Sequence, residues 1–394
     1  MRWVALIPLR SNREWGTQKN ITQRMAGRLP FAWSLEQAIA SCCFDALYIA
    51  TDLPDIREKL LSELPEAHEN VRILSDPTVA AIGEGSGNGA LLEFQRLTAF
   101  DAACVIAPTF PLTRAADFRA AKHKFLAENL DSLVTAVRLK RPLWTTAGIP
   151  VKSGAMKNRG VAHGSQEYLM ETGAFFIARA QTPRECGSHL DGHCGIHEMA
   201  AETSLEITDE AGWVAAERFL SDQKLAAARA RARQIRALVL DVDGTLTDAG
   251  MYYGPAGEAL KKFNTRDAHG LQRLREHGIT VCVITTEDSP AVEARMKKLR
   301  IEEYYPGVGN KLPLLLELAK RWDISIGDIG YVGDDLSDLE CLSRVGSAFC
   351  PADAVPQVMQ QVHYVCDSPG GHGAVREVCE LILESREKTR RVAS

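Results

Sequence analysis

A short apolar strand that runs directly into two aspartates constrains this chain more than any other feature. Residues 237–240, Ala-Leu-Val-Leu, are followed by Asp241-Val-Asp243-Gly-Thr. Residues i and i+2 of a strand point to the same side, so both carboxylates face one way. Open parallel sheets carry their active sites at the carboxyl ends of their strands. The sequence therefore predicts an α/β domain with two carboxylates at one strand end, where one can attack phosphorus while the other handles protons.

Two later strand ends supply complementary groups. The first ends in Thr285, whose hydroxyl can hydrogen-bond a phosphoryl oxygen, and the second carries three carboxylates of the kind Mg²⁺ prefers: Asp334, Asp335 and Asp338. Lys311, between these two strands in the sequence, offers a cation for charge developing on the phosphoryl group. The alternative interpretation is that these carboxylates only cap strands and helices.

This set of motifs, over residues 236–383, resembles the haloacid dehalogenase superfamily. The resemblance implies that Asp241 forms an aspartyl-phosphate and that Asp243 acts first as general acid and then as general base. It implies that Thr285 and Lys311 bind the phosphoryl group. It also implies that Mg²⁺ is held by Asp241, the carbonyl of Asp243 and Asp334, with Asp335 or Asp338 in support.

The sequence between the first two motifs leaves no room for a large cap domain. Residues 250–263 predict a β-hairpin, and the tail carries Ser-Pro-Gly-Gly-His-Gly-Ala-Val-Arg376. Both segments resemble the capless, tetrameric phosphatases that act on 3-deoxy-octulosonate 8-phosphate and on nonulosonate 9-phosphates. In that group a neighbouring subunit closes the site, and the tail includes Arg376 as a substrate-binding residue.

Three charged residues favour the nonulosonate, or sialic acid-like, branch. Octulosonate phosphatases usually carry Thr-Gly-Arg after the second strand, whereas this chain has Thr285-Thr286-Glu287. Glu287, Arg295 and Lys298 are spaced by eight and three, which predicts one face of a helix. The resemblance implies that they bind the sugar acid, and the alternative is a surface charge cluster.

The N-terminal part alternates predicted strands with predicted helices, which indicates a parallel sheet covered on both faces. The predicted strands are 3–8, 46–51 and 103–107, and the predicted helices are 30–41, 55–64 and 115–128. An Ala/Arg-rich helix from about 215 to 234 suits a semi-rigid linker, although its charges also fit a solvated face. We therefore expect two doubly wound parallel-sheet α/β domains, Rossmann-like, at 1–222 and 236–394, with a helical linker at 223–235.

Residues 1–220 resemble the acylneuraminate cytidylyltransferases, which transfer CMP from CTP to a sialic acid. The matching stretches are Pro-Thr-x-Pro-Leu at 108–112, Tyr-Leu-Met-Glu-Thr-Gly-Ala-Phe-Phe at 168–176, and Ser-Leu-Glu-Ile-Thr-Asp209 with Trp213. The single positions that match are Arg10, Lys19, Asn20, Asp52 and Ser86. The resemblance implies that Arg10, Lys19, Asn20 and Ser86 bind CTP, and that Asp209 contributes to a metal site.

This domain also departs from the family pattern. The first loop lacks the paired glycines of Arg-Gly-Gly-Ser-Lys-Gly, Ala107 replaces a Gln, and Thr172 replaces an Asn. Three interpretations follow: CMP transfer to a sialic acid, nucleotide transfer to a different acid, or a degenerate domain kept as a scaffold. For the whole chain, the non-enzymatic alternative is a scaffold that binds ligands without turnover, but a pure binder would not need the phosphatase set.

A segment rich in soft ligands, Cys186-x-x-His189-x-x-x-His193-Cys194-x-x-His197, raises the question of zinc. Its spacing fits no standard zinc finger, so a solvated loop or a dimer-contact segment is favoured over a metal site.

Composition sets the remaining expectations. The net charge of −5 argues against a nucleic-acid partner, and no apolar run could span a bilayer. The ten cysteines include no Cys-x-x-Cys pair and indicate reduced thiols in a cytoplasm. The combined hypothesis is a cytoplasmic homotetramer that removes the 9-phosphate from a nonulosonic acid and then charges the acid with CMP from CTP, using Mg²⁺.

Overall fold

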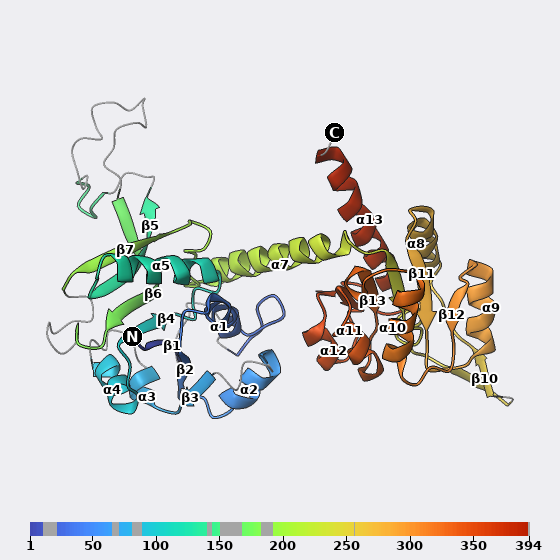
Figure 1. The fold of residues 1–394 in the computed structure, drawn as a ribbon, viewed down its shortest axis with the longest axis horizontal. Helices are drawn as coiled ribbons and strands as arrows, with labels where there is room; N and C mark the ends of the chain where they lie inside the picture. The colour runs from blue at the N-terminus through green and yellow to red at the C-terminus, as the bar shows by residue number, and fades with distance from the viewer. Residues whose placement is uncertain are drawn as a thin grey trace. The chain divides into compact units, whose positions relative to one another are not determined.

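The computed structural model describes residues 1–10, 22–64, 71–80, 89–139, 144–149, 168–182, 192–255 and 257–392. The chain divides into two compact units, Met1–Leu220 and Ser221–Ser394, and both are built from a sheet flanked by helices (Figure 1). The predicted α/β class is therefore confirmed. Every helix among the described residues is too short or too polar to span a bilayer.

The first unit contains a seven-stranded sheet in the order β3-β2-β1-β4-β6-β5-β7. Its strands are β1 (Trp3–Leu9), β2 (Ala46–Thr51), β3 (Val71–Leu74), β4 (Ala102–Ile106), β5 (Ser132–Leu139), β6 (Tyr168–Arg179) and β7 (Cys194–Met199). Strand β1 is parallel to both β2 and β4. The carboxyl ends of these three strands therefore share one edge of the sheet.

The expectation of a wholly parallel sheet is wrong for β6. This strand runs antiparallel to both of its neighbours, β4 and β5. A parallel neighbour needs a crossover connection, usually a helix, whereas an antiparallel neighbour needs none. The sequence between β5 and β6 is rich in Pro, Gly and basic residues and shows no helical period.

Alternate residues of β1 enter two separate cores. Ala5 and Ile7 lie in the core beneath α1 (Pro30–Ser41), α2 (Ile56–Glu63) and α5 (Ala115–Ala127). Val4 and Leu6 lie in the core beneath α3 (Pro77–Ala80) and α4 (Gly89–Leu97). Since side chains alternate across a strand, this division shows that helices cover both faces of the sheet.

Helix α7 (Glu210–Ala232), yellow-green in Figure 1, runs across the division between the units. It begins earlier than the predicted start at residue 215. Trp213 and Ala216 lie in the core of the first unit, and Ala228 and Ala232 lie in the core of the second. One continuous helix therefore contributes apolar side chains to both units.

The second unit contains a six-stranded sheet in the order β12-β11-β8-β13-β14-β15, and every pair of neighbours is parallel. Its strands are β8 (Ala237–Leu240), β11 (Thr280–Ile284), β12 (Glu303–Tyr305), β13 (Ile329–Val332), β14 (Ser347–Cys350) and β15 (Tyr364–Val365). The chain leaves β8 for β11 on one side and later adds β13 on the other. The end of β8 is therefore the switch point where ligands bind in such sheets.

Helices again cover both faces. Leu238 and Leu240 point to the core beneath α8 (Thr265–Glu276), α9 (Pro290–Leu299) and α13 (Ala374–Val392). Ala237 and Val239 point to the core beneath α10 (Lys311–Arg321), α11 (Leu339–Leu342) and α12 (Pro356–Gln361). Two short 3₁₀ helices, η3 (Ile326–Asp328) and η4 (Leu336–Asp338), flank β13.

The predicted hairpin in residues 250–263 is confirmed. Strands β9 (Tyr252–Gly254) and β10 (Gly257–Leu260) pair antiparallel as a two-stranded sheet separate from the main one. Between β8 and β11 the described chain forms only this hairpin and α8. That arrangement agrees with the expected lack of a large cap.

Candidate active site

The centre of the second unit is a lysine held between two aspartates. Lys311 is the first residue of α10, and its side chain is only 1% exposed. Its Nζ lies 2.6 Å from Oδ1 of Asp241, which directly follows β8, and 2.7 Å from Oδ1 of Asp338. Charge-assisted hydrogen bonds of this length are among the stronger ones in proteins. The lysine therefore fixes the position of the Asp241 carboxylate.

Two hydroxyl groups orient the carboxylates that follow β13. The Tyr331 hydroxyl donates to Oδ1 of Asp338 at 2.8 Å, and the Thr245 hydroxyl donates to Oδ1 of Asp334 at 3.1 Å. One carboxylate oxygen from each of Asp241, Asp334 and Asp338 lies within 4.8 Å of the others. Three oxygens converging in this way can surround one divalent cation.

The electrostatics of this cluster favour a cation. Burial, followed by the charge of Asp338, raises the pKa of Asp241 to about 7, although Lys311 opposes the shift. Burial, together with the charges of Asp241 and Asp338, raises the pKa of Asp334 to about 8. Burial alone would lower the pKa of Lys311, but the two aspartates raise it. One ammonium group therefore leaves negative charge uncompensated, and the residues fit a divalent metal.

Two glycines allow the backbone to approach these carboxylates. Gly244 has φ of +81°, and a Cβ there would lie 1.9 Å from Oδ2 of Asp334. A Cβ on Gly370, in the tail loop before α13, would lie 1.8 Å from the carbonyl oxygen of Gly244. Any side chain at either position would displace the loop that carries Asp241.

Asp243 is held by a contact that no motif indicates. Its Oδ1 lies 2.6 Å from Nζ of Lys261, just after β10, and 3.5 Å from the hydroxyl of Thr247. Its Oδ2 is buried and has no hydrogen-bond partner among the described residues. Oδ1 of Asp243 is therefore held by Lys261, while Oδ2 has no partner among the described residues and can take part in proton transfer.

The structure brings Thr285 to the same edge of the sheet. Strands β8 and β11 are parallel with Leu240 opposite Val283, so Asp241 and Thr285 follow neighbouring strand ends. Thr285 is buried, and its hydroxyl accepts a hydrogen bond from the backbone of Glu287 at 3.3 Å. Asp335 is exposed and caps η4 through Leu336 N, whereas Asp338 is fully buried and joins the carboxylate cluster.

The predicted substrate residues are distributed more widely. Glu287 is exposed and precedes α9, so the helical spacing applies only to Arg295 and Lys298. Arg295 donates to the carbonyl oxygen of Asn264 at 3.3 Å and stacks on Phe263, 5.6 Å from the ring centre. Lys298 is exposed. The structure therefore places Arg295 beside the segment that follows the hairpin.

Arg376 lies in the first turn of α13. Its backbone N–H donates to Oδ1 of Asp267 at 2.8 Å, and its guanidinium pairs with Glu380. Asp267, on α8, is 1% exposed, and burial raises its pKa to about 6. The positive charges of Arg295 and Arg376 oppose this rise and lower the pKa of Asp267.

Several buried polar atoms of this unit have no hydrogen-bond partner among the described residues. They are Oδ2 of Asp243, Oδ2 of Asp267, the hydroxyl groups of Tyr304 and Ser347, and Nε of Arg229, Arg275 and Arg295. Unsatisfied buried polar groups are rare and call for a ligand, water or ion.

In the first unit, three segments meet at the carboxyl edge of the sheet. Half-buried Arg10 directly follows β1, and exposed Asp52 directly follows β2. Thr109, after β4, is buried, and its hydroxyl has no partner among the described residues. The backbone N–H of Ile207 donates to the Thr109 carbonyl at 3.0 Å, which joins the 204–209 stretch to this loop. Lys19, Asn20 and Ser86 lie outside the described residues.

Asp209 has a structural contact at the start of α7. It is exposed, and its Oδ1 accepts a hydrogen bond from Gly212 N at 2.7 Å. Among the described residues it belongs to no cluster that could hold a metal. Its predicted metal-binding role therefore remains a prediction.

The soft-ligand segment is only partly described, since Cys186 and His189 lie outside the described residues. Cys194 is exposed, and His197 Nε2 lies 3.4 Å from Oδ1 of Asp117 on α5. All nine cysteines among the described residues are free thiols.

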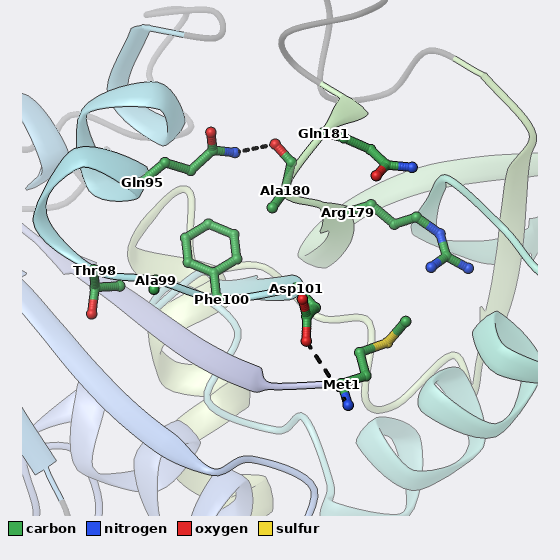
Figure 2. Close-up of a pocket in the computed structure, with 9 residues that line it drawn as sticks. All are labelled: Met1, Gln95, Thr98, Ala99, Phe100, Asp101, Arg179, Ala180 and Gln181. Carbon is green, nitrogen blue, oxygen red and sulfur yellow. Dashed lines mark hydrogen bonds and ion pairs between the residues drawn. The ribbon is translucent and has the colours of Figure 1, made fainter.

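A cavity of about 600 Å³ in the first unit lies away from the predicted nucleotide edge (Figure 2). It is lined by Met1 and Asp101, which precede β1 and β4, and by Arg179 at the end of the antiparallel β6. Asp101 Oδ2 lies 3.9 Å from the Met1 amino group. Arg179 donates to Leu130 O at 2.7 Å. These polar groups are already engaged, and none belongs to the predicted sites.

Sequence reasoning missed Lys261, Thr245 and Tyr331. Lys261 and Lys262 are adjacent and alike in sequence, but the first side chain is fully buried and the second is 50% exposed. Thr245 lies inside the first motif, where its hydroxyl is a recognisable candidate. Tyr331 is a polar residue in an otherwise apolar strand, which is the only sequence indication of its contact with Asp338.

The comparisons with known proteins agree with this site. The model of the haloacid dehalogenase-like hydrolase family matches residues 302–378, which include Lys311, Asp334 and Asp338. The chain is 42% identical over 159 residues to 3-deoxy-D-manno-octulosonate 8-phosphate phosphatase KdsC of Escherichia coli K12, covering 40% of this chain and 85% of that protein. The chain therefore belongs, through its second unit, to the haloacid dehalogenase-like hydrolases.

Within that family its relatives include several KdsC phosphatases. The Yersinia pestis protein of that name is 40% identical over 158 residues, covering 40% of this chain and 84% of that protein. A solved structure of the Moraxella catarrhalis phosphatase of the same type, in complex with a magnesium ion, a phosphate ion and KDO, is 34% identical. It covers 42% of this chain and 96% of that chain, with a TM-score of 0.41.

Proposed function

We propose that the second unit hydrolyses the phosphate monoester of a sugar acid through an aspartyl-phosphate on Asp241. The observation that carries this proposal is the buried Lys311, bonded to both Asp241 and Asp338 beside Asp334. This arrangement holds a carboxylate nucleophile at a switch point of the sheet. It also keeps a cation within reach of the charge that develops on phosphorus.

In the first half-reaction, a carboxylate oxygen of Asp241 attacks phosphorus and the bond from phosphorus to the sugar oxygen breaks. Asp243 gives its proton to the departing oxygen, so the sugar leaves as an alcohol. Lys311 and Thr285 bind the phosphoryl oxygens during this transfer. Mg²⁺ at Asp241, Asp334 and Asp338 would neutralise the carboxylates and the phosphoryl charge.

In the second half-reaction, Asp243 is a carboxylate and acts as general base. It takes a proton from water while the water oxygen attacks phosphorus, and the bond between phosphorus and Asp241 breaks. Inorganic phosphate leaves, Asp241 regains its carboxylate and Asp243 is protonated for the next cycle. Asp241 is thus the nucleophile throughout, Asp243 acts first as acid and then as base, and both residues return to their starting protonation states.

The relatives support the proposed substrate class, and buried polar atoms near the candidate site are consistent with it. The relatives are named for 3-deoxy-octulosonate 8-phosphate, which supports a phosphorylated sugar acid. The unpartnered atoms of Asp267, Arg295 and Tyr304 suit its hydroxyl groups. Within this class we favour a nonulosonate 9-phosphate, because Glu287 stands where octulosonate phosphatases usually have Arg. Glu287, Arg295, Lys298 and Arg376 are the residues proposed to bind the sugar.

We further propose that the unit works as a homotetramer in which a neighbouring copy closes the site. The hairpin supports this, since it exposes large apolar side chains: Met251, Tyr252, Tyr253 and Leu260. Tyr253 alone is 73% exposed. Apolar surface of this kind beside a capless active site suits burial against a second subunit.

For the first unit we propose CMP transfer from CTP to the dephosphorylated acid, in the cytoplasm. The buried, unpartnered hydroxyl of Thr109 beside the 204–209 stretch supports a ligand at this edge. Arg10 would neutralise part of the triphosphate, and the acceptor hydroxyl would attack the α-phosphate and release pyrophosphate. The alternatives are a different acid acceptor and a scaffold without turnover.

One experiment tests both units at once. The full chain is incubated with Mg²⁺, CTP and a panel of octulosonates, nonulosonates and their phosphates, while phosphate and pyrophosphate are measured separately. We expect phosphate from a phosphorylated acid and pyrophosphate only when a free acid is present. Absence of phosphate with every ester contradicts the phosphatase, and absence of pyrophosphate with every acid favours the scaffold.

A further inference from the structure

Two neighbouring lysines at the end of the hairpin have opposite environments. Lys262 is 50% exposed and pairs with Asp248 at 2.8 Å. Lys261 has a fully buried side chain, and its Nζ lies 2.6 Å from Oδ1 of Asp243. An ammonium group is buried only at a large desolvation cost unless it is paired. The Lys261 ammonium is paired in this way, with Asp243 and with Oε2 of Glu258 at 3.6 Å.

Asp243 itself is asymmetric. Its Oδ1 is engaged by Lys261, whereas its Oδ2 is buried and has no hydrogen-bond partner in the part of the chain that is described. A carboxyl group that transfers a proton needs one oxygen directed at the reacting atom. The lysine fixes Oδ1 and therefore determines where Oδ2 points.

A second carboxylate connects Lys261 to the main fold. Nζ of Lys261 lies 3.6 Å from Oε2 of Glu258 in β10, and Oε1 of Glu258 accepts a hydrogen bond from the hydroxyl of Ser289 at 2.7 Å. Ser289 is 2% exposed and directly precedes α9. The hairpin is not part of the six-stranded sheet. This chain of contacts therefore anchors it and, through Lys261, sets the position of Asp243.

We propose that Lys261 is a positioning residue for proton transfer by Asp243, which rests on the phosphatase activity proposed above. As the bond from Asp241 to phosphorus forms and the bond to the sugar oxygen breaks, the proton on Oδ2 of Asp243 moves to that oxygen. Asp243 is left as a carboxylate, and the ammonium of Lys261 compensates its new charge. The simpler alternative is that Lys261 only stabilises the fold by neutralising a buried acid.

The two interpretations differ in how the rate depends on the leaving group. An alkoxide needs a proton to depart, whereas p-nitrophenolate leaves without one. For Lys261→Met we expect kcat/KM to fall about 100-fold for the sugar-acid phosphate that the wild-type protein hydrolyses best, because general acid catalysis and its alignment contribute factors of this size. For p-nitrophenyl phosphate we expect a fall below about 3-fold. Lys262→Met is the matched control and should preserve the wild-type ratio.

The ratio of the two kcat/KM values is the deciding quantity. Equal losses on both substrates overturn the proposal and leave Lys261 a stabilising residue. If Lys261→Met does not fold, the same ratio measured on Lys261→Gln decides, and an unchanged ratio overturns the proposal. Wild-type protein that hydrolyses none of the sugar-acid phosphates and no p-nitrophenyl phosphate contradicts the phosphatase itself, which is a separate outcome.

Discussion

The two units place their candidate residues at the same edge of their sheets, but the described contacts that hold these residues differ. In the second unit, Asp241 directly follows β8, Asp334 follows β13 after one glycine, and Lys311 begins a helix, so packed elements fix all three. In the first unit, Arg10 and Asp52 also follow strands, whereas Lys19, Asn20 and Ser86 lie outside the described residues. The comparison teaches that a site built on the ends of packed elements is held by contacts within itself, such as those of Lys311 with Asp241 and Asp338.

The largest expected effect separates the units completely. Asp241→Asn removes the nucleophile, so phosphate release from a sugar-acid phosphate should fall at least ~10³-fold. Pyrophosphate release by the first unit should not change. Asp323→Asn, an exposed residue with positive φ that Asn tolerates, is the control. Phosphate release that survives Asp241→Asn would contradict the assigned nucleophile.

The second prediction concerns how tightly the second unit depends on Lys311. Lys311→Met leaves Asp241 and Asp338 buried without their cation. Breaking a buried ion pair from one side costs about 3–5 kcal/mol of unfolding free energy. Urea unfolding of the second unit, followed by circular dichroism, measures the loss. Lys320→Met, on the exposed face of the same helix, should change stability by less than about 0.5 kcal/mol.

The third prediction asks whether the first unit binds CTP at its carboxyl edge. Arg10→Ala removes a charge-assisted contact to the triphosphate, worth about 1.5–3 kcal/mol, so the Kd for CTP should rise roughly 10–100-fold. Calorimetric titration measures it, with Arg72→Ala, on β3, as the control. An unchanged Kd in Arg10→Ala would show that the nucleotide, if it binds, binds elsewhere.

The fourth prediction sharpens the choice of sugar acid. Glu287→Gly should alter the ratio of kcat/KM for nonulosonate 9-phosphate and octulosonate 8-phosphate by about 10-fold, within the range of one pocket contact. Arg295→Ala should raise KM for both esters without affecting p-nitrophenyl phosphate. An unchanged ratio in Glu287→Gly would place the selection of the acid elsewhere in the site.

The smallest expected effect is the pH dependence of thermal stability when the carboxylate cluster of Asp241, Asp334 and Asp338 holds no metal ion. The pKa values of Asp241 and Asp334, about 7 and about 8, are raised above the unfolded value of about 3.9. The folded protein therefore holds protons that the unfolded chain has released, and its stability falls as pH rises through this window. With EDTA, the Tm of the second unit should be about 3 °C or more lower at pH 8.5 than at pH 6.

Adding Mg²⁺ should remove this difference, because the cation replaces the lost protons. Asp334→Asn should reduce the pH dependence in EDTA. A Tm in EDTA that rises between pH 6 and pH 8.5 would contradict the raised pKa values. Thermal unfolding followed by circular dichroism provides the measurement.

The sequence predicted those parts of the fold and site that follow strand periodicity. Asp241 and Asp334 were recognisable because each ends an apolar run, and the hairpin was recognisable by its turn residues. The antiparallel direction of β6 could not be recognised from the sequence, because the direction of pairing depends on how a segment returns to the sheet. Lys261 was not recognisable either, because its burial comes from packing of the hairpin and its neighbour Lys262 has the same side chain.

The close approach of Gly370 to Gly244 has a consequence for biosynthesis. The loop that carries Asp241 emerges from the ribosome well before the tail segment that packs against it. Asp267 likewise emerges before Arg376, whose backbone N–H donates a hydrogen bond to it. Domains fold as units while the chain is still being made, N-terminal first. The first unit can thus complete its sheet on the ribosome, whereas the phosphatase centre is assembled only after α13 has been translated.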